Sequence, residues 1–216
     1  RAIFSNIQFA QQVLPDLDNT KSIVSMLPSA HMYGLMFELL YELTVGAHVH
    51  FLSRVPSPKI IMRAMAEVKP YLVIAVPLVI EKIYKSKVKP ILEKEGIKVL
   101  MKLPVLNQVV LNKIKTELIN AFGGEFYEVI IGGAAFNKEV AAFFTQIGFP
   151  FTVGYGMTEC APIITYDDWN VEKLNSCGKA APNLEVKIDS ADPENVAGEI
   201  LVKGDNVFLG YYKNEE

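Results

Sequence analysis

The sequence predicts an α/β protein, in which a parallel-rich sheet layered with helices is followed by the opening strands of an antiparallel, β-barrel-like subdomain. Two observations predict the sheet: a β-rich run, Tyr71 to Val76, leads into a helical pattern that opens at Pro77, and a buried run, Val129 to Ile131, leads into a glycine pair. Such strand-to-helix steps are typical of parallel sheets. A third observation predicts the antiparallel strands: beyond Pro162, three short β segments, Leu184 to Ile188, Gly198 to Lys203 and Val207 to Tyr212, are separated only by turns, without helical periodicity. We expect the stretch from Cys160 to Asn170 to be loop and the antiparallel strands to begin after Cys177.

The first part of the chain predicts two strands that flank a buried helix. Lys21 to Leu27 is a short β-leaning run, and Ala47 to Leu52 alternates histidine with apolar residues in the two-residue period of a strand. Between them, Met32 to Leu43 is apolar on almost every side except at Glu38 and Glu42. We therefore expect this segment to be a buried helix.

The middle of the chain predicts helices whose ends are marked by capping residues. Ser57 precedes a proline and starts a helix that ends before Pro70, while Asn137 starts another that closes at Gly148. Lysine and glutamate are frequent from residue 82 to 102, which predicts surface helices with loops. A helix with apolar residues at helical spacing follows and closes at a glycine pair; its markers are Val110, Leu111, Ile114, Leu118, Phe122, Gly123 and Gly124.

The segment from Val153 to Pro162, VGYGMTECAP, follows a buried strand, and we expect the rest of the chain to be organised around it. In open α/β sheets ligands bind at the carboxyl ends of the strands. The two glycines on either side of Tyr155 would let a ligand approach the backbone, leaving the tyrosine ring free to lie against a planar group. Thr158 and Glu159 together suit a phosphate with Mg²⁺, which prefers one or two carboxylates and phosphate oxygens. Judged on its residues alone, the segment fits equally well a strand, a turn and a helix with one exposed glutamate.

A second glycine-rich strand end, Gly132 to Ala135, lies some twenty residues upstream. By itself it predicts only a tight turn between a strand and a helix. Opposite Tyr155 it would form one wall of a cleft that holds a planar base. Two common nucleotide motifs are missing from the sequence, because Glu159 stands where a dinucleotide fingerprint needs a third glycine and no P-loop pattern is present.

Composition narrows the function classes. Net charge is −3 with acids and bases interspersed, which argues against a nucleic-acid partner. The longest apolar run, Leu72 to Ile80, has nine residues and is too short to span a bilayer. The two cysteines, Cys160 and Cys177, form no metal-binding or disulfide pattern, so we expect a cytoplasmic protein.

Four segments, in the same order along the chain, resemble motifs of the adenylate-forming superfamily, which includes acyl-CoA synthetases. Gly154 to Glu159 resembles its Tyr-Gly-x-Thr-Glu motif, and Gly132 to Phe136 lies at its adenine-loop position. Pro28 to Gly34, which contains His31, is similar to its Pro-x-x-His-x-x-Gly segment, and Gly198 to Tyr212 to its Gly-Glu and Gly-Tyr-Tyr segment. Pro77 to Tyr84 and Gly156 to Pro162 look most like long-chain fatty acid–CoA ligases.

The resemblance implies an enzyme that uses ATP and Mg²⁺ to convert a fatty acid into an acyl-adenylate and then transfers the acyl group to coenzyme A. It assigns Glu159 to the metal, Thr158 to a phosphate oxygen, and His31 to the carboxylate being activated. The residues assigned to the nucleotide and the acyl pocket are Gly133, Ala134, Ala135, Tyr155, Gly154, Gly156 and Met157. Adenylation of another carboxylic acid, or a non-catalytic fragment that keeps part of a nucleotide site, are the alternatives.

The resemblance also sets expectations for domains and partners. We expect an α/β part from 1 to 178 and opening strands of a β subdomain from 179 to 216. The family's phosphate loop, its ribose aspartate and its C-terminal domain with the adenylation lysine are not matched in the sequence, so we expect an interior piece of the enzyme, inactive alone. The partners would be fatty acid, ATP and coenzyme A, with possible peripheral association of the parent with membranes.

Overall fold

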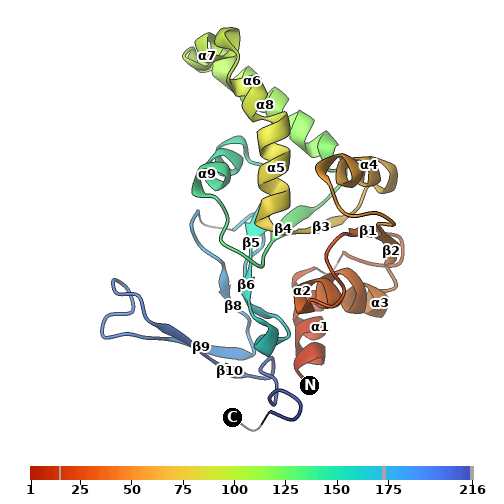
Figure 1. Cartoon of the computed structure of the whole chain (residues 1–216). Helices are drawn as coiled ribbons and strands as arrows, with labels where there is room; N and C mark the ends of the chain where they lie inside the picture. Colours follow the sequence, from red (N-terminus) through yellow and green to blue (C-terminus); the bar gives the residue numbers. More distant parts are fainter. Residues whose placement is uncertain (15, 172–173, 215–216) are drawn as a thin grey trace.

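A five-stranded parallel sheet forms the centre of the molecule (Figure 1). The computed structural model describes residues 1–14, 16–171 and 174–214. The strand order is β2-β1-β3-β4-β5, and all four neighbouring pairs are parallel. The strands are β1 (Ser22–Ser25), β2 (His48–Phe51), β3 (Leu72–Ala75), β4 (Glu128–Ile131) and β5 (Phe151–Val153). The predicted parallel α/β fold is confirmed.

Helices cover both faces of the sheet because successive strand side chains point to opposite sides. On one face, Val73 and Ala75 pack in a core with α4 (Pro58–Val68), α5 (Pro77–Lys87), α8 (Pro104–Ala121) and α9 (Lys138–Ile147). On the other face, Leu72 and Ile74 pack with α1 (Ala2–Val13) and the helical segment from 32 to 45. Figure 1 shows these two groups of helices above and below the strands. The sheet is therefore the middle layer of three.

Helix ends lie where the capping residues predict them. The Ser57 hydroxyl accepts the N–H of Ile60 at the start of α4, and the Asn137 side chain accepts two backbone N–H groups at the start of α9. Gly148 ends α9 in the left-handed conformation. The lysine-rich region, residues 82 to 102, forms the end of α5 and the short helices α6 (Lys89–Leu92) and α7 (Glu95–Met101). No helix among the described residues is both long enough and apolar enough to cross a membrane.

The predicted buried helix consists of α2 (Met32–Leu35), a π-helical segment η1 (Met36–Leu40) and α3 (Tyr41–Val45). Its two glutamates, Glu38 and Glu42, face the interior although they interrupt the apolar pattern, and both are almost fully buried. Glu38 Oε2 accepts the N–H groups of Met26 at 3.0 Å and Leu27 at 2.8 Å. Neither oxygen of Glu42 has a hydrogen-bond partner among the described residues. Burial raises the pKa of Glu38 to about 7 and that of Glu42 to about 8.

Three expectations for the last third of the chain are wrong. Antiparallel pairing begins at β6 (Tyr155–Gly156), not after Cys177, because β6 pairs with β7 (Ile163–Tyr166), which pairs with β8 (Lys179–Ala180). The stretch from 160 to 170 is accordingly not only loop. The run from 207 to 212 is not a strand, because its backbone bonds elsewhere: the Phe208 N–H donates to the carbonyl of Glu159.

Two antiparallel strands, β9 (Leu184–Asp189) and β10 (Glu199–Gly204), pair in full register and project from the sheet region as a hairpin (Figure 1). No helix occurs between residues 184 and 212, as the absence of helical periodicity predicts. The expected division into domains at residue 178 stays a prediction.

Candidate functional site

The glycine-rich segment that ends at Pro162 follows β5 and turns back on itself. Gly154 lies between β5 and β6, and a 3-10 turn, η2 (Thr158–Cys160), leads from β6 to Pro162 and β7. The Met157 N–H donates to the carbonyl of Pro162 at 2.8 Å. A Cβ atom on Gly156 would lie 2.1 Å from that same carbonyl oxygen. The close approach of the Pro162 carbonyl therefore requires glycine at position 156. The sequence suggested a different reason, namely clearance for a ligand.

The side chain of Asn6 in α1 forms hydrogen bonds to both ends of the turn from Cys160 to Ile163. Its Nδ2 donates to the carbonyl of Cys160 at 2.9 Å, and its Oδ1 accepts the N–H of Ile163 at 3.0 Å. Asn6 is fully buried, and both groups it bonds belong to buried residues. One side chain therefore satisfies the two ends of the turn that carries Thr158 and Glu159.

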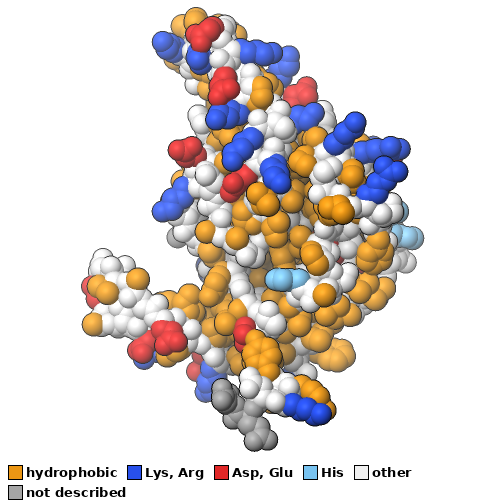
Figure 2. Space-filling model, viewed as in Figure 1, with side chains coloured by type: hydrophobic (Ala, Val, Ile, Leu, Met, Phe, Trp, Pro, Cys, Tyr) orange, Lys and Arg blue, Asp and Glu red, His pale blue; other side chains and the backbone are white. Residues whose placement is uncertain are grey.

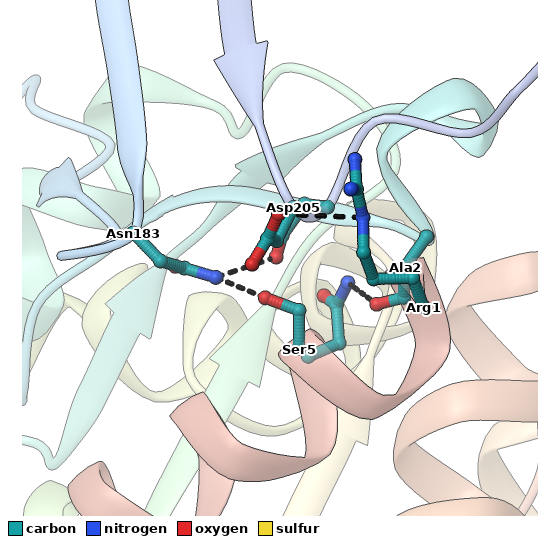
Figure 3. A network of polar contacts seen from close by, with 7 residues as sticks. Arg1, Ala2, Ser5, Asn183 and Asp205 are labelled. Carbon is teal, nitrogen blue, oxygen red and sulfur yellow. Dashed lines mark hydrogen bonds and ion pairs between the residues drawn. The ribbon is translucent and has the colours of Figure 1, made fainter.

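A polar network next to Asn6 joins α1 to the last strands (Figure 3). Asn183 donates to the hydroxyl of Ser5 and to Oδ1 of Asn206, and Asn206 in turn donates to the carbonyl of Ile163 at 2.8 Å. Arg1 forms an exposed ion pair with Asp205. The loop is thus fixed between the first helix and the segment after β10.

One cavity lies between the two glycine-rich strand ends, as the sequence predicts. It encloses about 1150 Å³ including its open mouth, and its lining includes Gly133 to Ala135 after β4 and Tyr155 and Gly156 after β5. The residues from 174 to 177 also line it. The Tyr155 side chain is partly exposed. An aromatic ring and a glycine-rich backbone segment on one cavity suit a planar base.

A second cavity lies between the sheet, α1 and α2. It encloses about 700 Å³ including its mouth. Its lining is mostly apolar and aromatic; polar atoms come from His31, Thr158 and three tyrosine hydroxyls, and the lining contains no lysine, arginine, aspartate or glutamate. Apolar wall residues include Phe9, Val13, Phe37, Ile74, Ile130 and Ile163. In the view of Figure 2, hydrophobic side chains gather over the middle of the molecule. Such a lining suits an apolar ligand.

The two cavities meet at the predicted motif residues. Gly133, Gly154, Tyr155 and Gly156 line both of them. Met157 and Thr158 line the apolar cavity only, whereas Ala134 and Ala135 line the other cavity only. A molecule with a planar base at one end and an apolar chain at the other would therefore cross the backbone of Gly154 to Gly156.

His31 lies at the mouth of the apolar cavity and starts α2. Its Nδ1 accepts the backbone N–H of Tyr33 at 3.3 Å. Because Nδ1 is the acceptor, the neutral ring carries its proton on Nε2. His31 can therefore offer an N–H to a carboxylate at the rim of the cavity.

Glu159 lines neither cavity. The Tyr211 hydroxyl donates to its Oε1, and this hydrogen bond is the main reason why the pKa of Glu159 lies below its usual range. The carboxylate is therefore ionised at neutral pH. The described residues contain no cluster of three or more metal-ligating side chains. A single ionised carboxylate fits Mg²⁺ that takes its other ligands from phosphate and water.

Some lining residues were not predicted. The helix α1 supplies Phe9 and Val13 to the apolar cavity, and the loop before β8 supplies Cys177 to the other. The spacing of Ile3, Ile7, Ala10 and Leu14 could have indicated α1. Nothing local to the sequence marks the residues from 174 to 177 as cavity lining.

Comparisons with known proteins identify the family of this chain. Residues 1–212 match the family model described as AMP-binding enzyme. A human long-chain-fatty-acid–CoA ligase, ACSBG2, is 28% identical over 92% of this chain and 33% of its own length. Long-chain-fatty-acid–CoA ligase 1 of Saccharomyces cerevisiae is 30% identical over 94% of the chain and 32% of its own length. The chain thus spans about a third of the length of these relatives.

Solved structures share the fold at low identity. A malonyl-CoA ligase with methylmalonyl-CoA and AMP bound superposes with a TM-score of 0.73 at 20% identity, over 100% of this chain and 41% of that one. An o-succinylbenzoate CoA synthetase from Bacillus subtilis gives a TM-score of 0.72 at 19% identity, over 99% and 38%. The family match extends over nearly the whole chain and includes both glycine-rich strand ends. The chain belongs to the AMP-binding enzyme family.

Proposed function

We propose that the protein containing this chain activates a fatty acid with ATP, as an acyl-adenylate, and then transfers the acyl group to coenzyme A. The observation that carries this proposal is the meeting of a base-sized cavity and an apolar cavity along Gly154 to Gly156. An acyl-adenylate has the same two parts, joined at the acyl phosphate. The relatives named long-chain-fatty-acid–CoA ligases support the same substrate class.

In this proposal the nucleotide occupies the cavity beside β4 and β5. Tyr155 would stack on adenine, and the backbone from Gly133 to Ala135 would face the edge of the base. Stacking on one aromatic side chain contributes on the order of 1–3 kcal/mol. The Thr158 hydroxyl would donate to a phosphate oxygen near the place where the two cavities meet.

The chemical step needs charge neutralisation, because a carboxylate has to attack an anionic α-phosphate. Mg²⁺ held by Glu159 would supply it at the phosphates. His31 would orient the attacking carboxylate through its Nε2–H at the rim. Met157 and the apolar wall would exclude water from the acyl group. We propose coenzyme A as the acceptor from the family relationship.

Small dicarboxylic and aromatic acids are the alternative substrates, because solved structures with this fold include malonyl-CoA and benzoate CoA ligases. The apolar cavity argues against a dicarboxylic acid. Its lining offers no arginine or lysine to pair with a second carboxylate, and a buried unpaired charge is costly. A long alkyl chain meets no such penalty.

Acid-dependent exchange of pyrophosphate into ATP tests the proposal. Because the chain spans about a third of its relatives, the assay uses the product of the whole reading frame that encodes it. We expect exchange with palmitate and little with malonate or benzoate. Glu159→Gln should lower the rate about 10²-fold or more, because it removes the carboxylate that would hold Mg²⁺ where negative charge develops in the transition state. Glu117→Gln, at an exposed position of α8, is the matched control. Malonate exchange above palmitate, or an unchanged rate in Glu159→Gln, would contradict the proposal.

A further inference from the structure

The helices α5 to α8 form an arm that projects away from the sheet (Figure 1). Buried side chains anchor the end of the arm near the sheet, among them Ile80 and Ile83 of α5 and Ile114 and Leu118 of α8. The short helices α6 and α7 contain no fully buried residue. The far end of the arm is thus held largely by contacts among its own helices.

The arm has the opposite charge to the rest of the protein. Residues 77–121 contain nine lysines, four glutamates and no other charged residue, which gives a net charge of +5. The remaining residues hold 12 basic and 20 acidic side chains, a net charge of −8. Figure 2 shows the basic side chains spread over the upper part of the molecule, where the arm lies. An anionic surface would therefore attract this arm and repel the rest of the chain.

The far end of the arm also exposes large apolar side chains. Five of them lie within eleven residues, namely Val99, Leu103, Val105, Leu106 and Val109, and each is at least 40% exposed. Val105, Val109 and the exposed Lys113 follow one another at four-residue spacing on α8, so they share one side of the helix. On α7 and the turn after it, Lys98 precedes Val99 and Lys102 precedes Leu103. Exposed apolar side chains and exposed lysines therefore lie close together at this end of the arm.

We propose that this end of the arm, residues 98 to 113, docks on an anionic lipid surface. The apolar side chains would enter the boundary between headgroups and acyl chains, and the lysines would reach the headgroup phosphates along their flexible stems. A contact between the arms of two copies of the chain is disfavoured, because it would bring one +5 arm against another. The arm is a projection and not a groove, which suits a flat surface better than a partner helix. The proposal does not rest on the proposed enzymatic function.

Vesicle co-sedimentation without substrate tests this docking surface. The product of the whole reading frame is mixed with phosphatidylcholine vesicles that contain about a third phosphatidylserine, or none. A lysine near an anionic surface contributes about fivefold in affinity. We therefore expect Lys102→Glu/Lys113→Glu to weaken binding to anionic vesicles at least tenfold, and Val105→Glu/Val109→Glu to weaken it by a similar factor. Both pairs replace exposed residues, so thermal unfolding should be unchanged.

The matched control is Val55→Glu/Lys59→Glu, an exposed apolar and basic pair before and in α4. It should bind anionic vesicles like the unmodified protein. Wild-type affinity in both arm variants, or equal binding to vesicles without phosphatidylserine, would overturn the proposal. A concentration-dependent dimer that Val105→Glu/Val109→Glu abolishes, with no vesicle binding, would assign the surface to a second copy and also overturn it. Because no step involves ATP or acid, these results are independent of the exchange assay.

Discussion

Asn6→Ala removes the side chain that holds both ends of the loop carrying Thr158 and Glu159. The substitution breaks the bonds to the Cys160 carbonyl and the Ile163 N–H, which are 2.9 and 3.0 Å long. Both groups stay buried, and an unsatisfied buried polar group costs about 1–3 kcal/mol. Two such groups, with some relaxation of the loop, should lower the free energy of unfolding by about 3 kcal/mol.

Urea unfolding followed by fluorescence measures this loss, and ATP titration measures whether the loop still presents Thr158. The matched control is Asn195→Ala, because Asn195 is exposed and bonds only Asp192 nearby. That variant should unfold within about 0.5 kcal/mol of the unmodified protein. If Asn6→Ala also changed stability by less than about 0.5 kcal/mol, Asn6 would not hold the loop and the reasoning from its hydrogen bonds would be refuted.

Three further outcomes follow from the same structure. Gly156→Ala should unfold at a lower urea concentration and lose acid-dependent exchange, because its Cβ would lie 2.1 Å from the Pro162 oxygen; unchanged stability would show that the turn relaxes easily. Glu42→Gln should flatten the pH dependence of stability: the raised pKa of Glu42, about 8, means that the folded state holds a proton that the unfolded state has lost above about pH 4.5. Stability from this group therefore falls as pH rises to 8, by at most ~5 kcal/mol at ~1.4 kcal/mol per pKa unit, and a urea series at several pH values in which both proteins fall alike would exclude the effect. Finally, the 216-residue chain should bind ATP with Mg²⁺ no tighter than about millimolar, since that already requires about 4 kcal/mol; a micromolar constant by calorimetry would place the phosphate-binding groups within this sequence.

Local features of the sequence predicted most of the parallel sheet and the helix ends. The strand β3 is a continuous apolar run, and β4 is apolar after Glu128. Ser57 and Asn137 use their own side chains to cap the helices that follow them in the chain. These interactions involve residues close in sequence, so the pattern is visible without the fold. The helix α1 was not predicted: its apolar spacing was the only local signal, because the N-cap residue Arg1 makes no side-chain cap. The role of its Asn6 depends on groups more than 150 residues away.

The site was predicted in part for the same reason. The facing of Gly133 to Ala135 and Tyr155 follows from the rule that parallel strands present their carboxyl ends at one edge, and the structure brings them to one cavity. The wall formed by Phe9 and the bond between Glu159 and Tyr211 depend on long-range packing. The segment after β10 has a β-like composition, yet it bonds the loop at Glu159 and forms no ladder. Composition alone does not encode that choice.

A crystal structure of the whole protein with a non-hydrolysable palmitoyl-adenylate analogue tests the central claim most directly. We expect the adenine ring against Tyr155 and Ala134, the acyl phosphate mimic beside Gly156 and Thr158, and the alkyl chain in the cavity behind them. An alkyl chain that lies outside the apolar cavity, or an adenine ring away from Tyr155, would contradict the account.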